Sequence, residues 1–317
     1  MTHQMTVRRA RYSDAGEILA LFETAYNGNY PWAQLHSREA LSKHIQIAEE
    51  AFYVAAFESE IVGCVSCRVL RETLEPRTGE HVAEICKLCT STRIRHRDQV
   101  ARELCRAVLR DSEARGATGW YATVRSAASL RIAESLGFVA VGYTEEHVVG
   151  DRRESHVIML LRNATSFADR VLPVNLQGCD SVYGSALVQT VTRDLCLAAA
   201  APAEYPSQAF VVAAEAEARC ARFHFNVAER RMRAAALLAE PFTYWDALVP
   251  CDKADVIARL RANGFRLTAF LPAWHELRFD CVLLSMSLER AIAADALLER
   301  RVRRFKDLTS RSEVRHV

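Results

Sequence analysis

Four cysteines are spaced as zinc ligands are. Cys64, Cys67, Cys86 and Cys89 form the pattern C-x2-C-x18-C-x2-C, and four thiolates at such spacing can hold a structural zinc ion. Both pairs, however, lie in apolar runs typical of β-strands, where side chains three residues apart point to opposite faces. A zinc site needs a tight turn to bring each pair together. The pattern therefore favours reduced cysteines that fill a sheet, with no bound metal, and a zinc protein is the alternative.

Composition and charge limit the class of protein. The chain has 317 residues, 50% hydrophobic and 25% charged, which is typical of a globular protein of about two domains. Lys and Arg number 41 against 39 Asp and Glu, a net charge of +2, so we expect no nucleic-acid partner. No apolar run reaches the ~20 residues of a membrane span, and residues 1–9 lack a secretory signal. We expect a cytoplasmic protein with no membrane partner.

In the first half of the chain, hydrophobic periodicity predicts helices and strands in the order β-α-α-β-β-β-α-β-α-β-β. These elements must position any functional site there. Gly116 and Gly137 mark two helix ends, because glycine readily adopts the left-handed conformation that closes a helix. Ser37 and Ser126 are candidate N-caps. The predicted elements are strand 7–10, helix 14–25, a helix after Ser37, hairpin 51–57 and 61–70, strand 81–90, helix 98–115, strand 119–124, helix 126–136, and hairpin 138–147 and 154–161.

Two short motifs add to this order. Leu136-Gly137-Phe138 ends a short helix, and Ala83-Glu84-Ile85 opens the central strand. With them, residues 5–162 resemble the GNAT superfamily of acyl-CoA-dependent N-acyltransferases. The resemblance implies an α/β (α+β) fold, a mixed and mostly antiparallel sheet flanked by helices. It also implies acetyl-CoA or another acyl-CoA as co-substrate.

The resemblance implies that the cofactor pyrophosphate binds amides at the start of the helix after the central strand, where a helix N-terminus favours anions. Gln99 replaces a glycine of the family motif, and Asp98 puts a carboxylate where phosphates should lie. Arg93, Arg95 and Arg97 could offset that charge. The residues at this place are His96, Arg97, Asp98, Gln99, Val100 and Ala101.

The same resemblance implies further contacts to the cofactor. The amides of Leu88, Cys89 and Thr90 would hold the pantetheine and the thioester oxygen. Ser126 falls where many relatives carry an asparagine that contacts the pantetheine arm, and a plain helix N-cap is the alternative reading of Ser126.

Catalytic roles also follow from the resemblance. Glu84 matches a strand position that some family members use as general base, and the alternative is a structural or solvent-facing glutamate. The family's tyrosine general acid would align with Ala133, so that role is vacant, and Tyr121, Tyr143 or a water could fill it. The candidates on the acceptor side are Tyr30, Trp32 and Tyr121.

The second half repeats parts of the first. Residues 51–56 return as residues 209–214, and Leu136-Gly137-Phe138 returns as Asn263-Gly264-Phe265. The offsets are 209 − 51 = 158 and 264 − 137 = 127, so the second copy is 31 residues shorter. That interval holds the central strand and the cofactor loop with its helix. We therefore expect an acyltransferase domain at residues 1–162 and, at residues 163–317, a reduced GNAT-like domain that lacks the cofactor-loop module.

The function expected from the resemblance is N-acylation, by direct attack, of an amine on a small molecule. A non-catalytic binding or scaffold protein of the same fold is one alternative. An acyltransferase that uses a carrier-protein thioester is another, for which the altered pyrophosphate loop matters less. An acyl carrier protein and a second copy of the chain, as a homodimer, stay open as partners.

Overall fold

Two groups of helices and strands make up the computed structural model, and each is described by itself. The first unit comprises Met1–Ala122, Ala128–Phe138 and Leu160–Arg162, and the second comprises Thr123–Ala127, Val139–Met159 and Asn163–Val317. The residues that the structure describes are 5–28, 35, 37–46, 50–70, 73, 78–149, 152–163, 171–173, 182, 185–195, 197, 201–203, 212–215, 220–224, 244–275, 279–287, 291–293 and 295–311.

The strands of the first unit form a sheet in the order β1-β2-β3-β4-β5. Neighbouring strands are antiparallel except β4 and β5, which are parallel. The predicted fold class, a mostly antiparallel sheet flanked by helices, is therefore confirmed. The elements are β1 (Met5–Arg9), η1 (Tyr12–Asp14), α1 (Ala15–Tyr26), α2 (Arg38–Gln46), β2 (Glu50–Phe57), β3 (Glu60–Leu70), β4 (His81–Thr90), α3 (Arg97–Glu113), β5 (Ala117–Val124) and α4 (Ala127–Ser135).

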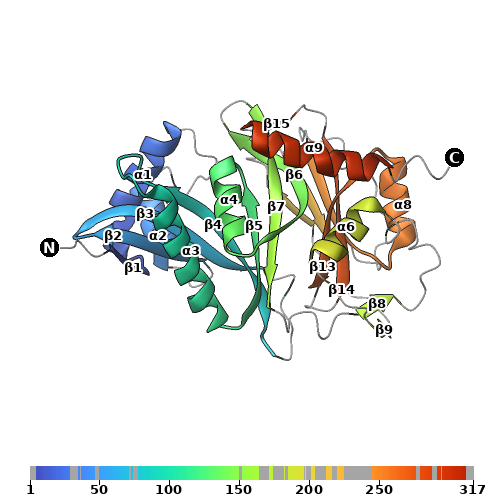
Figure 1. Cartoon of the computed structure of the whole chain (residues 1–317), viewed down its shortest axis with the longest axis horizontal. Helices are drawn as coiled ribbons and strands as arrows, with labels where there is room; N and C mark the ends of the chain where they lie inside the picture. The colour runs from blue at the N-terminus through green and yellow to red at the C-terminus, as the bar shows by residue number, and fades with distance from the viewer. Residues whose placement is uncertain are drawn as a thin grey trace. The chain divides into compact units, whose positions relative to one another are not determined.

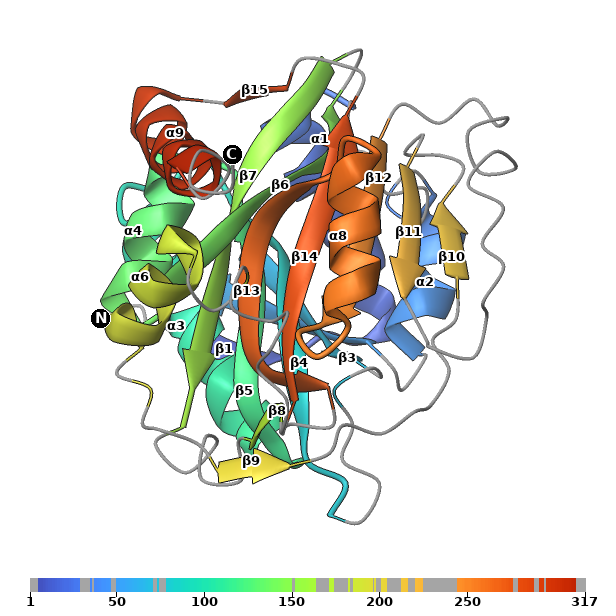
Figure 2. The same ribbon diagram turned by 90° about the vertical axis from the view of Figure 1, so that its right-hand side faces the viewer.

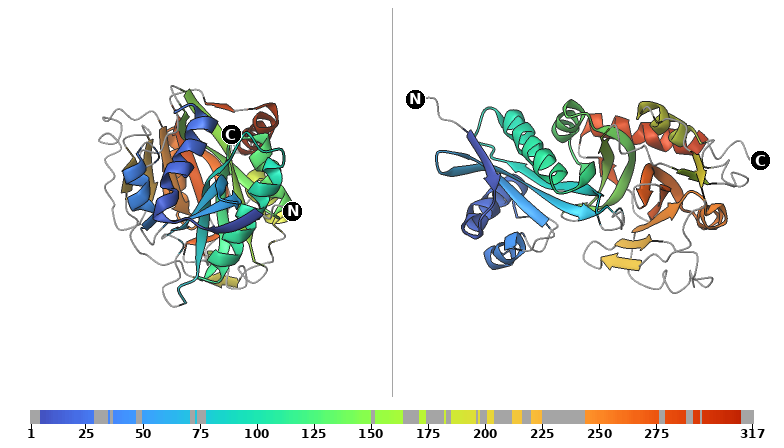
Figure 3. Two further views of the ribbon diagram at one scale, coloured as in Figure 1. Left: turned by 90° about the vertical axis from the view of Figure 1, so that its left-hand side faces the viewer. Right: turned by 90° about the horizontal axis from the view of Figure 1, so that it is seen from below.

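Helices cover both faces of this sheet (Figure 3). On one face α1 packs against β3 and β4 and also contacts α2, burying Ile18 and Phe22 among strand residues such as Val54. On the other face α3 buries the residues at its i, i+4 and i+8 positions, Val100, Leu104 and Val108. The α3 helix approaches closely at Gly63, where a Cβ would lie 3.0 Å from Leu104 Cδ1.

The second unit holds a sheet in the order β7-β6-β13-β14-β12-β11-β10 (Figure 2). Helices α6 and α9 pack together and contact β6 and β13 (Figure 1). Its elements are β6 (Val139–Val149), β7 (Arg152–Arg162), β8 (Val171–Pro173), α6 (Ala186–Asp194), β9 (Ala201–Ala203), β10 (Val212–Glu215), β11 (Cys220–His224), β12 (Tyr244–Pro250), α8 (Ala254–Ala262), β13 (Arg266–His275), β14 (Phe279–Ser287), β15 (Ile292–Ala293) and α9 (Ala296–Arg311).

Helices α4 and α8 end in the same way. Gly137 and Gly264 both have φ of 90°, and each N–H donates 3.0 Å to a carbonyl three residues earlier. Phe138 and Phe265 then donate 3.1 Å to carbonyls five residues earlier. This is a left-handed glycine cap in both helices. The repeated Gly-Phe pair of the sequence thus has the same backbone role in each unit.

Strand pairing disagrees with the predicted correspondence between residues 51–56 and residues 209–214. β10 is antiparallel to β11, and β11 is parallel to β12, as β3 pairs with β4 and β4 with β5. By pairing, β10 therefore corresponds to β3, whereas the sequence repeat aligned residues 209–214 with residues of β2. β11 has the place of β4, so the expected loss of the central strand is wrong. The counterpart of the cofactor loop would fall on residues 225–243, which lie outside the described residues.

Among the described residues, no helix combines the length and the apolar character that crossing a bilayer requires.

Candidate functional site

The two parallel strands of the first unit separate part-way along. β4 and β5 pair from His81 with Ala117 to Glu84 with Tyr121. Both strands are described in full and both continue, to Thr90 and Val124, without further pairing. Backbone amides and carbonyls that lose a strand partner must find another. The stretch beyond Glu84 is therefore a place where a ligand can meet the edge of β4.

A β-bulge lies directly beyond this point. Cys64 pairs with Cys89 but Ser66 pairs with Cys86, so three steps along β4 match two along β3 and one residue is extra. Lys87 lies in this interval with φ of 53°, a left-handed conformation that is unusual for lysine. The bulge turns the backbone of Leu88 and Cys89 away from regular register beside the opening.

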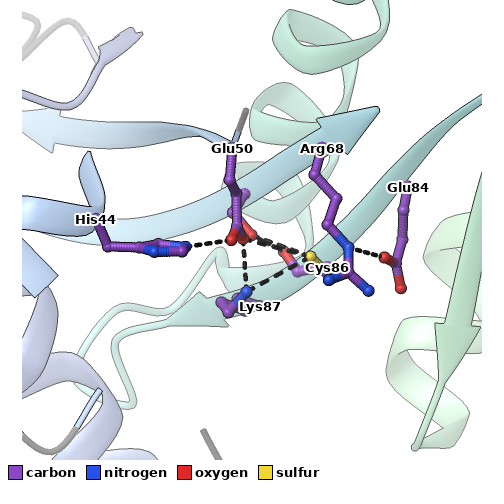
Figure 4. Close-up of polar contacts among 7 residues, drawn as sticks. His44, Glu50, Arg68, Glu84, Cys86 and Lys87 are labelled. Atoms are coloured by element: carbon purple, nitrogen blue, oxygen red, sulfur yellow. Dashed lines mark hydrogen bonds and ion pairs between the residues drawn. The ribbon is translucent and has the colours of Figure 1, made fainter. Parts of the chain in front are cut away.

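Glu84 lies in a cross-strand row with three other polar residues. Glu50 pairs with Arg68, Arg68 with Glu84, and Glu84 with Tyr121, so all four side chains are on one face of the sheet. Glu84 is only 7% exposed and its carboxylate accepts a hydrogen bond from Arg68 Nε (Figure 4). The charge of Glu84, with a smaller opposing effect of burial, raises the pKa of Arg68. A solvent-facing Glu84 is thus wrong, and a buried carboxylate paired with Arg68 stands at the end of the β4–β5 pairing.

A second buried carboxylate lies next to this pair. Glu50 Oε1 is 2.5 Å from Lys87 Nζ, and Glu50 Oε2 is 2.5 Å from His44 Nε2 (Figure 4). Burial alone would raise the pKa of Glu50. The charge of Lys87 and hydrogen bonds from Lys87, Ser66 and His44 outweigh it and lower this pKa to about 2. Sequence reasoning missed this cluster, although a lysine inside the apolar pattern of the strand 81–90 is a usable signal, because a buried charge needs a partner.

The start of α3 is exposed and helical in conformation. Gln99 and Val100 both donate their N–H to His96 O, at 3.0 and 3.1 Å. No residue between 91 and 101 has a positive φ, so Gln99 fits without backbone strain where the family motif has glycine. Arg97 Nε lies 3.5 Å from Thr90 Oγ1, and Asp98 is exposed in the first helical turn.

Comparison with known proteins identifies the first unit. Residues 17–138 match the sequence model of the acetyltransferase (GNAT) family. These residues form a GNAT domain. No curated protein matches significantly.

Solved structures similar to this chain include GNAT-type enzymes. A ribosomal-protein-alanine N-acetyltransferase of Brucella melitensis is 19% identical, with a TM-score of 0.42 over 50% of this chain and 99% of that one. An N-acetyltransferase of Staphylococcus aureus Mu50 is 17% identical, with a TM-score of 0.43 over 50% and 98%. A ribosomal-protein-S5-alanine acetyltransferase of Vibrio fischeri is also 17% identical, with a TM-score of 0.43 over 52% and 95%.

The other residues predicted for the GNAT site lie in α4, just before it, or outside the described residues. Tyr30 and Trp32 lie outside the described residues. Ala133, which the resemblance aligns with the family's general acid, is buried in α4. Ser126 precedes α4 and is half-buried, and the N–H of the next residue, Ala127, donates 2.5 Å to Asp295 Oδ2.

The four cysteines lie in the GNAT sheet as the strand pattern predicts. Cys64 and Cys89 pair directly and lie in the core with α1 and α2. Cys67 is on the other face: burial raises its pKa to about 12, and Ser112 and Arg115 of the α3 region lower it in part. Burial likewise raises the pKa of Cys86 to about 12. Within the described part of the chain, no three His, Cys, Asp or Glu residues are grouped as a metal site.

Proposed function

We propose that this protein transfers an acetyl or similar acyl group from acyl-CoA to an amine of a small molecule. One observation carries the proposal. The parallel pair β4–β5 opens beyond Glu84 and Tyr121, with a bulge beside the opening, inside the segment that matches the GNAT family. GNAT enzymes use acyl-CoA, and an opened parallel pair offers unpaired amides to a thioester.

In the proposed reaction the amine nitrogen attacks the thioester carbonyl directly. A C–N bond forms, the C–S bond breaks, and CoA leaves as a thiolate, which takes up one proton from a water, Tyr121 or Tyr143 to become the thiol. Glu84 accepts the proton that the amine loses, held in place by Arg68. The amides of Leu88 to Thr90 hold the pantetheine and the oxygen that gains negative charge.

The remaining assignments complete the proposal. Ser126 would contact the pantetheine, and residues 96–101 would bind the pyrophosphate at the α3 N-terminus. Tyr30, Trp32 and Tyr121 are proposed for the acceptor side. Tyr121 is half-buried and pairs directly with Glu84, which supports its place near the reacting amine.

Calorimetric titration with acetyl-CoA and with free CoA tests the proposal. We expect micromolar binding that Arg97→Ala weakens, followed by turnover with at least one member of an amine panel. A matched control is Arg106→Ala, which removes an exposed arginine two turns further along α3. Binding that Arg97→Ala leaves unchanged would contradict the place given to the pyrophosphate, and absence of binding would favour the scaffold alternative.

A second candidate donor is an acyl group carried on a carrier protein. The observation in its favour is Asp98, an exposed carboxylate in the first turn of α3, because a negative charge there repels the pyrophosphate of CoA. A carrier-bound phosphopantetheine has one phosphodiester in place of that group. Higher kcat/KM with an acyl carrier protein than with the matching acyl-CoA would favour this donor.

We also propose that residues 1–162 are the acyltransferase domain and residues 163–317 a reduced GNAT-like domain, which keeps a counterpart of the central strand in β11. The shared pairing pattern and the matching helix caps of α4 and α8 support a common ancestry of the two units. Limited proteolysis that gives stable fragments ending near residue 163 would support the boundary. Cleavage that leaves no stable fragment of either half would contradict it.

A further inference from the structure

The bulge of β4 places a lysine in a backbone conformation that costs free energy. Lys87 has φ of 53°, and a left-handed conformation is unfavourable for an L-residue other than glycine. Glycine or asparagine would adopt it more readily. A lysine at this position therefore needs interactions that hold it there.

The lysine side chain supplies those interactions. The Lys87 side chain is fully buried and that of Glu50 is only 6% exposed, with Nζ and Oε1 2.5 Å apart. Nζ also lies 5.8 Å from the centre of the Phe52 ring. His44 holds the second carboxylate oxygen of Glu50. The charge of the bulge residue is thus fixed to β2 and, through His44, to α2.

This pair lies at the place where the proposed reaction needs rigid donors. Lys87 immediately precedes Leu88, and the β4–β5 pairing ends three residues before Lys87. Without a neighbouring strand on that side, the direction of the Leu88 and Cys89 amides depends on the bulge. Donors that stabilise developing charge must be fixed before the reaction.

We propose that Glu50 and Lys87 are positioning residues for acyl transfer: their buried ion pair holds the β4 bulge so that the amides after it face the thioester oxygen. The inference rests on the proposed function. It assigns a role to two residues that touch neither donor nor acceptor. It also explains why a charged pair, which is costly to bury, is kept between the first residue of β2 and the bulge of β4.

Three variants and a matched control test it. Lys87→Met and Glu50→Gln each break the pair, and Lys87→Gly removes the side chain while accepting the left-handed backbone. The control is Asp14→Asn, which breaks another ion pair of the same unit, that of the buried Asp14 with the half-buried Arg8 at 2.6 Å. We expect the pair-breaking variants to lower kcat about 10²-fold, the effect of a lost oxyanion donor, with less than a threefold change in the dissociation constant of CoA.

A merely structural pair would behave like the control. In that case Lys87→Met, Lys87→Gly and Glu50→Gln would lose thermal stability as Asp14→Asn does and keep wild-type kcat, which overturns the inference. Deuterium exchange of a peptide covering residues 84–92 gives a readout independent of turnover, and we expect faster exchange there in Lys87→Gly than in the control. Wild-type protein that binds neither CoA nor acetyl-CoA would instead overturn the proposed function, and the inference with it.

Discussion

The parallel strand pairs of the two units differ in one respect. In the first unit β4 and β5 pair over four residues of β4 and then separate before β4 ends. In the second, β11 pairs with β12 along its whole described length, from Cys220 with Tyr244 to His224 with Leu248. A parallel pair closed by its own hydrogen bonds has no backbone donors to spare for a ligand. The same connectivity thus leaves an unpaired edge of β4 in the first unit, whereas all five described residues of β11 are paired in the second.

The buried polar groups of the two units differ accordingly. The first unit collects ion pairs beside its opening, Arg68 with Glu84 and Lys87 with Glu50. In the second unit the fully buried Asp246 accepts a hydrogen bond from Ser285 Oγ at 2.5 Å. The Ser285 hydroxyl in turn lies 2.9 Å from that of Thr268. Ion pairs therefore lie beside the opened pair, and a buried carboxylate hydrogen-bonded to hydroxyl groups lies beside the β11–β12 pair.

The largest expected effect is on Glu84. Glu84→Gln keeps the shape of the side chain but removes its ability to accept a proton, so we expect kcat to fall by about 10²–10⁴. Release of CoA thiol, measured at saturating acyl-CoA, gives kcat. The matched control is Glu103→Gln, a half-exposed glutamate of α3 paired with Arg106, which should leave kcat unchanged. Equal kcat in both variants would contradict the proposal that Glu84, at the opened β4–β5 pair, is the general base.

Acidification should reveal the buried pair of the first unit. The pKa of Glu50 is lowered from 4.5 to about 2, so its ionisation stabilises the folded state at neutral pH. That contribution is lost as pH falls below about 4.5 toward 2, and it amounts to roughly 3 kcal/mol. Urea unfolding between pH 7 and pH 3 should therefore show a smaller loss of stability in Glu50→Gln than in wild type.

The second unit also contains a carboxylate whose protonation lowers stability in acid. Glu154 there also has a pKa of about 2: burial would raise it, and hydrogen bonds and charge from His156 and Arg125 lower it. We therefore expect Glu50→Gln to remove only part of the decrease in the free energy of unfolding between pH 7 and pH 3. The control is Glu39→Gln, an exposed glutamate paired with Lys43. A Glu50→Gln profile that parallels the Glu39→Gln profile would contradict the assignment.

A substitution of Asp246 tests whether the β11–β12 pair contributes to stability without contributing to cofactor binding. Asp246→Asn weakens a hydrogen bond to a buried carboxylate, and we expect a loss of about 1–3 kcal/mol in the free energy of unfolding. The affinity for acetyl-CoA should stay within twofold of wild type. Calorimetry and urea unfolding of the same sample measure both quantities. Loss of cofactor affinity in a folded Asp246→Asn protein would show that binding depends on the second unit.

The smallest expected effect is at the start of α3. Asp98→Asn removes a negative charge from a helix N-terminus proposed to bind pyrophosphate, a change of about 0.3–1 kcal/mol. We expect a twofold to fivefold gain in acetyl-CoA affinity that shrinks at high salt, because exposed charges are screened. Unchanged affinity at low salt would place the pyrophosphate elsewhere, and Asp255→Asn in the first turn of α8 serves as control.

Most helices and strands of the first unit could be predicted from the sequence. β4 spans the predicted residues 81–90, and α3 begins at Arg97 and ends at Glu113 against a predicted 98–115. Such elements follow from side-chain periodicity and glycine caps, which are local properties of the chain. The Gly-Phe ends of α4 and α8 were readable for the same reason.

The pairing of these strands and the partners of the buried charges could not be predicted from the sequence. The end of pairing at Glu84, the bulge at Lys87 and the contact of Lys87 with Glu50, 37 residues away, depend on register between strands, which no single strand encodes. The pairing of β10 with β11 overturned the alignment of residues 209–214 for that reason. The Glu50 carboxylate and the Lys87 ammonium group are distant in sequence. They pair because burial removes water from both, and each charge then needs the other.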